Sequence, residues 1–172
     1  LRKVIIALKK TLALLIISFF LVGCDYKLRS SYQGLNDLVV NLYFIENSLN
    51  QEFASTLKRQ SGLRQLYLNK ETEDSDLEIE ILEHTITRYS SALGAGARTK
   101  EARLEYHLKI SLTPKGKKDD FLLEFKDNSY YSFNESRILA IEEVENRLRE
   151  NFFKNALKRI NFSLLNLLNE TN

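Results

Sequence analysis

The chain is short of the residues that catalytic and metal sites most often use. Its 172 residues include one cysteine and two histidines, and no glycine-rich stretch resembles a phosphate-binding loop. A single thiol cannot close a disulfide within the chain, so packing must stabilise the fold. No nucleophile stands beside a plausible base and an orienting group, and we therefore expect a protein that is not an enzyme.

The one cysteine, Cys24, ends the run Leu21-Val22-Gly23-Cys24, behind a basic start and an apolar stretch at residues 11–22. This order is typical of a bacterial lipoprotein signal, with a small residue before the cut. We expect removal of residues 1–23, an S-diacylglyceryl and an N-acyl group on Cys24, and no other cofactor. Several acyl chains anchor a protein firmly, whereas one chain, at ~0.8 kcal/mol per buried CH₂, binds marginally. The alternative is a buried cysteine behind a membrane helix, but the apolar run is marginal for a bilayer core of ~30 Å.

The charge of the expected mature chain differs from that of the whole sequence. The signal holds four of the 25 basic residues and none of the 23 acidic ones, so the mature part has 21 basic residues and a net charge of −2. Nucleic-acid binding needs a basic face on the folded domain, and this balance does not favour it. The mature length of about 149 residues suits one domain with its own core.

The expected mature chain consists of a polar tether at residues 24–36 and a single domain at residues 37–172. Alternating apolar and polar residues predict strands at four places: residues 38–44, 77–86, 102–112 and from residue 121 onward. Gly94 and Pro114 mark reversals between them. Residues 63–68 could add a short extended piece. A slip of the apolar phase between Ile81 and Leu82 predicts a β-bulge.

Two stretches have the period of a helix. The first is expected to begin with a capping box formed by Ser48 and Gln51 and to end near Gly62. The second, residues 136–168, would be ~50 Å long and is expected to bend or break near Asn161. Its apolar stripe should pack on the sheet, with Leu104, Leu108, Val144 and Leu148 in one core.

The element order is strand, helix, three strands, helix. Every predicted strand has one polar face, so only one side of the sheet needs a cover. We therefore predict an α+β fold: a two-layer sandwich with a four-stranded, mostly antiparallel sheet and two helices on one face.

The two histidines, His84 and His107, fall on adjacent predicted strands and raise the question of a metal pair. One register places four aliphatic side chains on the same face: Leu82, Ile86, Leu104 and Leu108. This register sets His84 opposite Tyr106 and turns His107 to the other face, near Glu83. No metal site is expected.

Two motifs and the element order carry a resemblance to a known family. Around the expected cleavage site the chain reads Gly23-Cys24-Asp25-Tyr26-Lys27-Leu28-Arg29-Ser30, and the last strand leads through Tyr131-Ser132-Phe133-Asn134-Glu135 to Ile138-Leu139-Ala140. These segments are similar to the Gly-Cys-Gly-aromatic opening and the aromatic-Ser-aromatic-Asp-Pro segment of the lipopolysaccharide-assembly lipoprotein LptE family. The chain departs from the family pattern at Glu135, where a proline is usual, and at Ile141, where a basic residue is common.

The resemblance implies a lipoprotein subunit that plugs the LptD barrel and helps to insert lipopolysaccharide into the outer leaflet. A large outer-membrane barrel has a polar lumen, which a polar sheet face could adjoin. The implied location is the periplasmic side of the outer membrane, with Cys24 as anchor. Asp25 leaves retention in the inner membrane open, because aspartate after the lipidated cysteine has that effect in enteric bacteria.

Basic residues gather around the reversal near Gly94. They are Arg88, Arg98, Lys100 and Arg103. Arginine forks match phosphate geometry, so Arg98, Lys100 and Arg103 are candidate contacts for the anionic groups of lipopolysaccharide. The alternative is a solvated hairpin end that prevents edge-to-edge association.

The aromatic stretch at residues 128–134 includes Tyr130, Tyr131 and Phe133, which are candidates for a partner interface. The alternative is that one or two of them pack under the last helix, and we expect both in part.

A different class of function stays open from the sequence alone. A stand-alone periplasmic lipoprotein that binds a lipid or another ligand would have the same signal, but it would need an enclosed apolar cavity.

Overall fold

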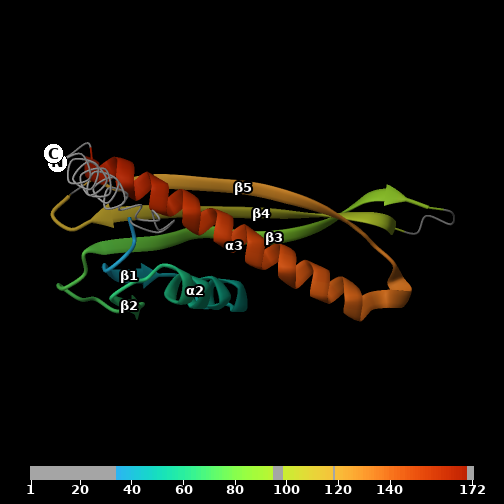
Figure 1. Ribbon diagram of the computed structural model, residues 1–172, viewed down its shortest axis with the longest axis horizontal. Helices are drawn as coiled ribbons and strands as arrows, with labels where there is room; N and C mark the ends of the chain where they lie inside the picture. Colours follow the sequence, from blue (N-terminus) through green and yellow to red (C-terminus); the bar gives the residue numbers. More distant parts are fainter. Residues whose placement is uncertain (1–33, 95–98, 118, 170–172) are drawn as a thin grey trace, which may run out of the picture. The chain divides into compact units, whose positions relative to one another are not determined.

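The computed structural model describes residues 34–94, 99–117 and 119–169. Figure 1 shows α3 (Ile138–Asn169) crossing in front of the long strands of the sheet, and α2 (Ser48–Gln60) beside the short strands. The elements in chain order are β1 (Val39–Tyr43), α2 (Ser48–Gln60), β2 (Gln65–Leu68), β3 (Leu77–Leu93), β4 (Thr99–Pro114), β5 (Phe121–Ser132), the 3-10 turn η2 (Glu135–Arg137) and α3 (Ile138–Asn169).

The predicted α+β class is confirmed, and the sheet has five strands rather than four. Their order is β2-β1-β3-β4-β5. The additional strand is the short extended piece, which pairs in parallel with β1 from Val39 to Leu42. β1 also pairs in parallel with β3, whereas the two long pairs β3–β4 and β4–β5 are antiparallel. Only four residues form β2, too few for alternation to distinguish a strand from an extended loop.

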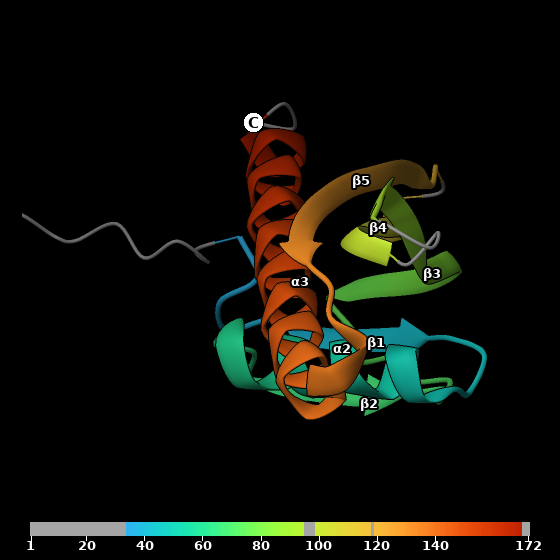
Figure 2. The same ribbon diagram turned by 90° about the vertical axis from the view of Figure 1, so that its right-hand side faces the viewer.

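The two helices pack on the same side of the sheet and on each other. Phe53 of α2 lies edge-on to Phe153 of α3, with ring centroids 5.6 Å apart. The predicted core is confirmed, because Leu104 and Leu108 belong to one cluster of buried side chains, and two residues of α3, Val144 and Leu148, pack against this cluster. Figure 2 shows α3 on the inner side of the curved sheet, with β5 bending over it.

The N-cap of the first helix lies one residue before the predicted cap, Ser48. Asn47 is the N-cap, and its side chain accepts a hydrogen bond of 2.8 Å from the backbone N–H of Asn50. An asparagine satisfies a free N–H as well as a serine does, and the predicted Ser48–Gln51 capping box is wrong. The predicted end is confirmed, since Gly62 follows α2 with a φ of 65°.

The predicted bulge in β3 is confirmed, but the register beyond it is wrong by two residues. The pairing with β4 shifts between Ile81 and Glu83, so Leu82 is the extra residue, and it is exposed rather than on the apolar face. His84 therefore pairs with Leu108 instead of Tyr106. A shift of two residues keeps each side chain on its face, which is why the apolar pattern could not detect it.

The last helix is continuous over 32 residues and passes through Asn161 without a break. Asn161 is buried, and its Oδ1 accepts a hydrogen bond of 3.0 Å from the backbone N–H of Leu35. Gly34 lies so close that a Cβ there would be 2.6 Å from the carbonyl oxygen of Asn161. Because Leu35 is fully buried, the packed domain begins earlier than the expected boundary at residue 37.

The lipidation site Cys24 and the rest of the expected signal and tether up to residue 33 lie outside the described residues. Within residues 34–94, 99–117 and 119–169, none of the helices has the length and apolar character needed to cross a bilayer.

Candidate functional site

The sheet face that points away from the helices carries the polar side chains of β3, β4 and β5, and we call it the open face. Strand pairing aligns these side chains in three successive rungs, from the hairpin end toward the middle of the sheet: Tyr89–Arg103–Tyr130, Thr87–Glu105–Asn128 and Thr85–His107–Lys126. We name them the aromatic rung, the middle rung and the histidine rung. Each rung brings together residues that are far apart in the sequence.

The aromatic rung holds an arginine between two tyrosines. The Arg103 guanidinium lies 5.5 Å from the ring centroid of Tyr89 and 6.0 Å from that of Tyr130, distances at which a cation is attracted to an aromatic face. Its Nη2 is 2.6 Å from Oε1 of Glu105 in the middle rung. A hydrogen bond with Tyr130, followed by the charge of Glu105, raises the pKa of Arg103. The tyrosines and Glu105 thus position the guanidinium of Arg103 on the open face.

The histidine rung is tied to carboxylates on both sides. His107 Nδ1 is 3.0 Å from Oε1 of Glu83, and Nε2 is 2.8 Å from Oε1 of Glu124. Lys126 contacts the same Glu124 oxygen at 2.8 Å. Hydrogen bonds from Lys126 and then from His107 lower the pKa of Glu124. The predicted position of His107 on the polar face near Glu83 is confirmed.

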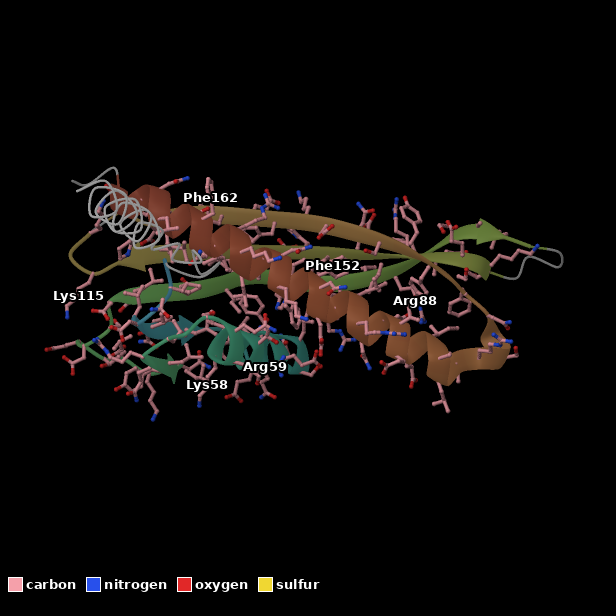
Figure 3. The ribbon with its side chains drawn as sticks, viewed as in Figure 1. Lys58, Arg59, Arg88, Lys115, Phe152 and Phe162 are labelled. Carbon is pink, nitrogen blue, oxygen red and sulfur yellow. The ribbon has the colours of Figure 1, made fainter. Side chains whose placement is uncertain are left out.

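The basic residues at the hairpin do not form one cluster. Arg88 points to the helix side, where Nη1 is 3.1 Å from Oε1 of Glu145 and the guanidinium lies 5.5 Å from the Phe133 ring centroid. Arg103 faces the opposite way, on the open face. Figure 3 shows Arg88 toward the hairpin end of the sheet and Lys115 at the other end.

Two of the three candidate lipopolysaccharide contacts can be located. Lys100 is exposed, and its side chain passes so close to Gly94 that a Cβ there would lie 2.4 Å from Lys100 Cε. Glycine at this position therefore lets the lysine cross the reversal. Arg103 stands in the aromatic rung, and Arg98 lies outside the described residues.

The three aromatic candidates for a partner interface separate onto different sides. Tyr130 is 56% exposed on the open face. Tyr131 is buried, and its hydroxyl donates to Glu145 of α3. Burial, and then the hydrogen bond to Glu145, raise the pKa of Tyr131 to about 12. Phe133 packs against the core, so the alternative of packing under the last helix holds for Tyr131 and Phe133.

The sequence model of the LptE family, described as lipopolysaccharide-assembly, matches residues 38–164. The chain belongs to this family. The match covers most of the chain, and no curated protein matches the sequence.

Solved structures of lipoproteins share the LptE-like fold of this chain. The rare lipoprotein B from Shewanella oneidensis superposes with a TM-score of 0.57 at 15% identity, covering 78% of this chain and 99% of that one. The uncharacterized lipoprotein B from Nitrosomonas europaea gives a TM-score of 0.56 at 18% identity, covering 80% and 88%. At such low identity the likeness establishes the fold alone.

The LptE-like segment between the last strand and the last helix forms a corner. β5 ends at Ser132, directly after Tyr131, and the Asn134 side chain caps the following turn by accepting a hydrogen bond of 3.0 Å from the backbone N–H of Ser136. The departure at Glu135 is accommodated because this position opens the 3-10 turn Glu135–Arg137. Ile138 and Leu139 stay exposed in the first turn of α3.

Sequence reasoning missed a buried polar contact under α2. His84 Nδ1 lies 2.6 Å from Oδ1 of Asn50, while Nε2 is buried without a hydrogen-bond partner in the described part of the chain. The rings of Phe53, Tyr106 and Phe153 surround the imidazole. Burial lowers the pKa of His84 to about 4. The sequence did not indicate that Asn50 is buried, because a polar residue early in a helix normally faces water.

Two hollows on the helix side also escaped sequence reasoning. One, of about 610 Å³, lies between α2 and α3, and the other, of about 390 Å³, lies between the helices and the sheet. Both include Glu52 and Arg149, whose ion pair is 3.0 Å long. In the part of the chain that the structure describes, no three carboxylate, imidazole or thiol groups come together as metal ligands.

Proposed function

We propose that this LptE-family protein is the lipoprotein subunit of an outer-membrane lipopolysaccharide assembly complex. In this role it would plug an LptD-like β-barrel and aid insertion of lipopolysaccharide into the outer leaflet. Lipids on Cys24 would hold it on the periplasmic side of the outer membrane. Membership of a lipopolysaccharide-assembly family implies a place in the Gram-negative envelope.

The observation that carries this proposal is a filled core beneath an uncovered polar sheet face. The inner face of the sheet and the two helices share one cluster of buried side chains. The open face presents the three polar rungs, with no helix packed on them among the described residues. A plug inside a hydrated barrel needs this combination, because the lumen of large outer-membrane barrels is polar.

The proposed contacts follow from the site. Lys100 and Arg103, with Arg98, would meet the anionic groups of lipopolysaccharide at the hairpin end. Tyr130 would reach the barrel directly from the open face, because it is the exposed member of the aromatic candidates. Tyr131 and Phe133 would act by holding the corner that leads into α3.

A stand-alone lipid carrier is the second candidate, and the hollows favour it less. Acyl chains need an apolar cavity enclosed by the fold. The hollow between α2 and α3 is instead lined mostly by polar side chains, among them Ser48, Gln51, Ser55 and Arg59. We also propose that the protein has no catalytic activity of its own.

Co-purification tests the proposed function. The full-length chain, tagged at its C-terminus, is extracted from membranes in mild detergent and analysed by size-exclusion chromatography with mass spectrometry. We expect it to elute with a much larger LptD-like barrel protein. Elution of the lipidated chain at its own size, with no barrel protein in the fraction, would refute the plug and favour the carrier.

A further inference from the structure

A third hollow, of about 400 Å³, lies on the open face and is lined by side chains from all three rungs. Thr85, Thr87 and Asn128 contribute short side chains, whereas Tyr89 contributes a much larger one. The hollow exists because three short residues stand between bulkier neighbours. Its volume lies within the range of small-molecule sites, about 300–1,000 Å³.

The lining offers many hydrogen bonds and little free charge. Threonine hydroxyls donate and accept, and the Asn128 amide does both. Two charged groups at the hollow have a partner of opposite charge: Glu105 pairs with Arg103 at 2.6 Å, and Lys126 pairs with Glu124 at 2.8 Å. The carboxylate of Asp127, also at the hollow, accepts a hydrogen bond of 3.2 Å from the Asn155 side chain. A phosphate would find no uncompensated cation here, whereas a neutral ligand rich in hydroxyl groups would find donors and acceptors.

The aromatic rung supplies the apolar surface that such a ligand also needs. Tyr89 is 45% exposed beside the hollow, and the guanidinium of Arg103 lies over its ring. This contact restricts the tyrosine and lowers the entropic cost of using it as a binding wall. Tyrosine combines a large apolar ring with a polar hydroxyl, which suits a ligand with C–H and O–H groups on different sides.

We propose that this hollow binds a neutral saccharide. One sugar ring packs its C–H face against Tyr89, and its hydroxyls exchange hydrogen bonds with Thr85, Thr87 and Asn128. The site differs from the proposed anion contacts at the hairpin end, because it recognises uncharged sugar rather than phosphate. The same chemistry is present in the oligosaccharide of lipopolysaccharide and in a free glycan.

A titration followed by NMR tests the proposal. The lipidated mature chain is labelled with ¹⁵N in detergent micelles and titrated with three probes: core oligosaccharide released from lipopolysaccharide, dephosphorylated and with its carboxyl groups reduced so that it is neutral, maltopentaose and inorganic phosphate. We expect the neutral sugars to shift the amide signals of Thr85, Thr87 and Asn128. A response to core oligosaccharide alone indicates lipopolysaccharide as the source, and an equal response to maltopentaose indicates a general glycan site.

Two variants and one control make the test specific. Thr87→Tyr fills the hollow and Tyr89→Leu removes the aromatic wall, so each should weaken sugar binding at least tenfold. Leu122→Tyr places the same aromatic side chain on the open face at an exposed position outside the hollow, and should bind as the parent does.

Three outcomes would overturn the saccharide site. The first is that neither sugar shifts the open-face signals while the parent is folded. The second is that phosphate alone shifts them. The third is that Thr87→Tyr keeps sugar binding but no longer co-purifies with the barrel, which would mean that the hollow receives part of LptD. Failure of co-purification by the parent would refute the proposed function and leave the sugar result unaffected.

Discussion

His84 and His107 stand on the adjacent strands β3 and β4, with their rings on opposite faces of the sheet. His84 is enclosed by aromatic rings beneath α2, and burial lowers its pKa to about 4. His107 lies on the open face between Glu83 and Glu124. A histidine thus packs in the core on one face of the sheet and joins a polar network on the other. The two-residue error in the predicted pairing of β3 with β4 does not affect this assignment, because a shift of two residues leaves each side chain on its face.

His84 should make the fold sensitive to mild acid. Its folded pKa of about 4 lies below the ordinary value of 6.5, so the unfolded chain binds more protons between these two pH values. Stability contributed by the neutral imidazole is complete above pH 6.5 and is lost as the pH falls to about 4. The loss should reach about 3 kcal/mol, which urea unfolding between pH 4 and 8 would measure.

Two variants isolate this effect from carboxylate titration. His84→Phe should be less stable at neutral pH, because Asn50 loses its partner, but its stability should fall less steeply between pH 6.5 and 4. His107→Gln should keep the parent's steep fall. An equally steep fall in His84→Phe would show that other groups cause the acid sensitivity.

Core and open-face positions on β4 should respond very differently to truncation. Leu108 is fully buried, so Leu108→Ala should lower the free energy of unfolding by ~2–5 kcal/mol. Arg103→Ala removes an exposed ion pair and should change the free energy of unfolding little. Denaturant unfolding of both variants at one pH measures the difference, and equal losses would contradict the assignment of the two faces.

Much of the fold could be predicted because β4 alternates strictly. Its inward positions, among them Leu104 and Leu108, are buried, and its outward positions Arg103 and His107 are polar and partly exposed. The bulge after Ile81 was predictable for the same reason, since an extra residue shifts the apolar phase. Because the helices cover only one face of the sheet, the alternation of apolar and polar residues shows which face of each strand is buried.

The candidate site depended on information that alternation does not contain. The rungs require the register of β3 on β4, which includes irregular pairing between Ser90 and Leu93 near the hairpin end. Arg88 and Arg103 lie on opposite faces because side chains alternate between the two faces along each strand. In the sequence they form a group only because both are close to Gly94. The Asn50–His84 contact joins two elements 34 residues apart, and only the packed fold brings them together.

Glu145 should be a stabilising carboxylate at the corner between β5 and α3. It accepts hydrogen bonds from Arg88 and from the Tyr131 hydroxyl, and its side chain is only 17% exposed. Glu145→Ala leaves both donors without this acceptor and should cost ~1–3 kcal/mol in thermal or urea unfolding. Glu143→Ala, on the same helix but exposed, breaks a 3.7 Å pair with Arg147 and should change little. If both variants lose similar stability, the change in helix propensity would explain the loss, and the hydrogen bonds of Glu145 would not.

Lipid attachment should depend on Cys24 alone, because the chain has no other thiol. Cys24→Ser should yield a protein without diacylglyceryl, either soluble or unprocessed. Mass spectrometry of the mature parent should find acylated Cys24 as the first residue. An unmodified Cys24, or a mature chain that starts elsewhere, would rule out the lipoprotein signal.

The basic residues at the hairpin end should contribute to lipopolysaccharide binding. Lys100 is exposed at the reversal, and Arg103 holds its charge beside Tyr89 and Tyr130. A charge-assisted contact is worth ~1.5–3 kcal/mol, so changing Arg98, Lys100 and Arg103 together to alanine should weaken binding well beyond tenfold. Of the three residues, Arg103 should contribute less to lipopolysaccharide binding, because its ion pair with Glu105 already neutralises part of its charge.

Salt and a matched control complete this test. Binding by the parent, measured by surface-immobilised lipopolysaccharide or by fluorescence, should weaken as ionic strength rises, because exposed phosphate contacts are screened. A double change of Lys115 and Lys117 to alanine removes positive charge at the opposite end of the sheet and should have a much smaller effect. If the triple variant binds like the parent at low salt while remaining folded and associated with the barrel, these residues form only a solvated hairpin end. Lipopolysaccharide must then be met elsewhere on the protein.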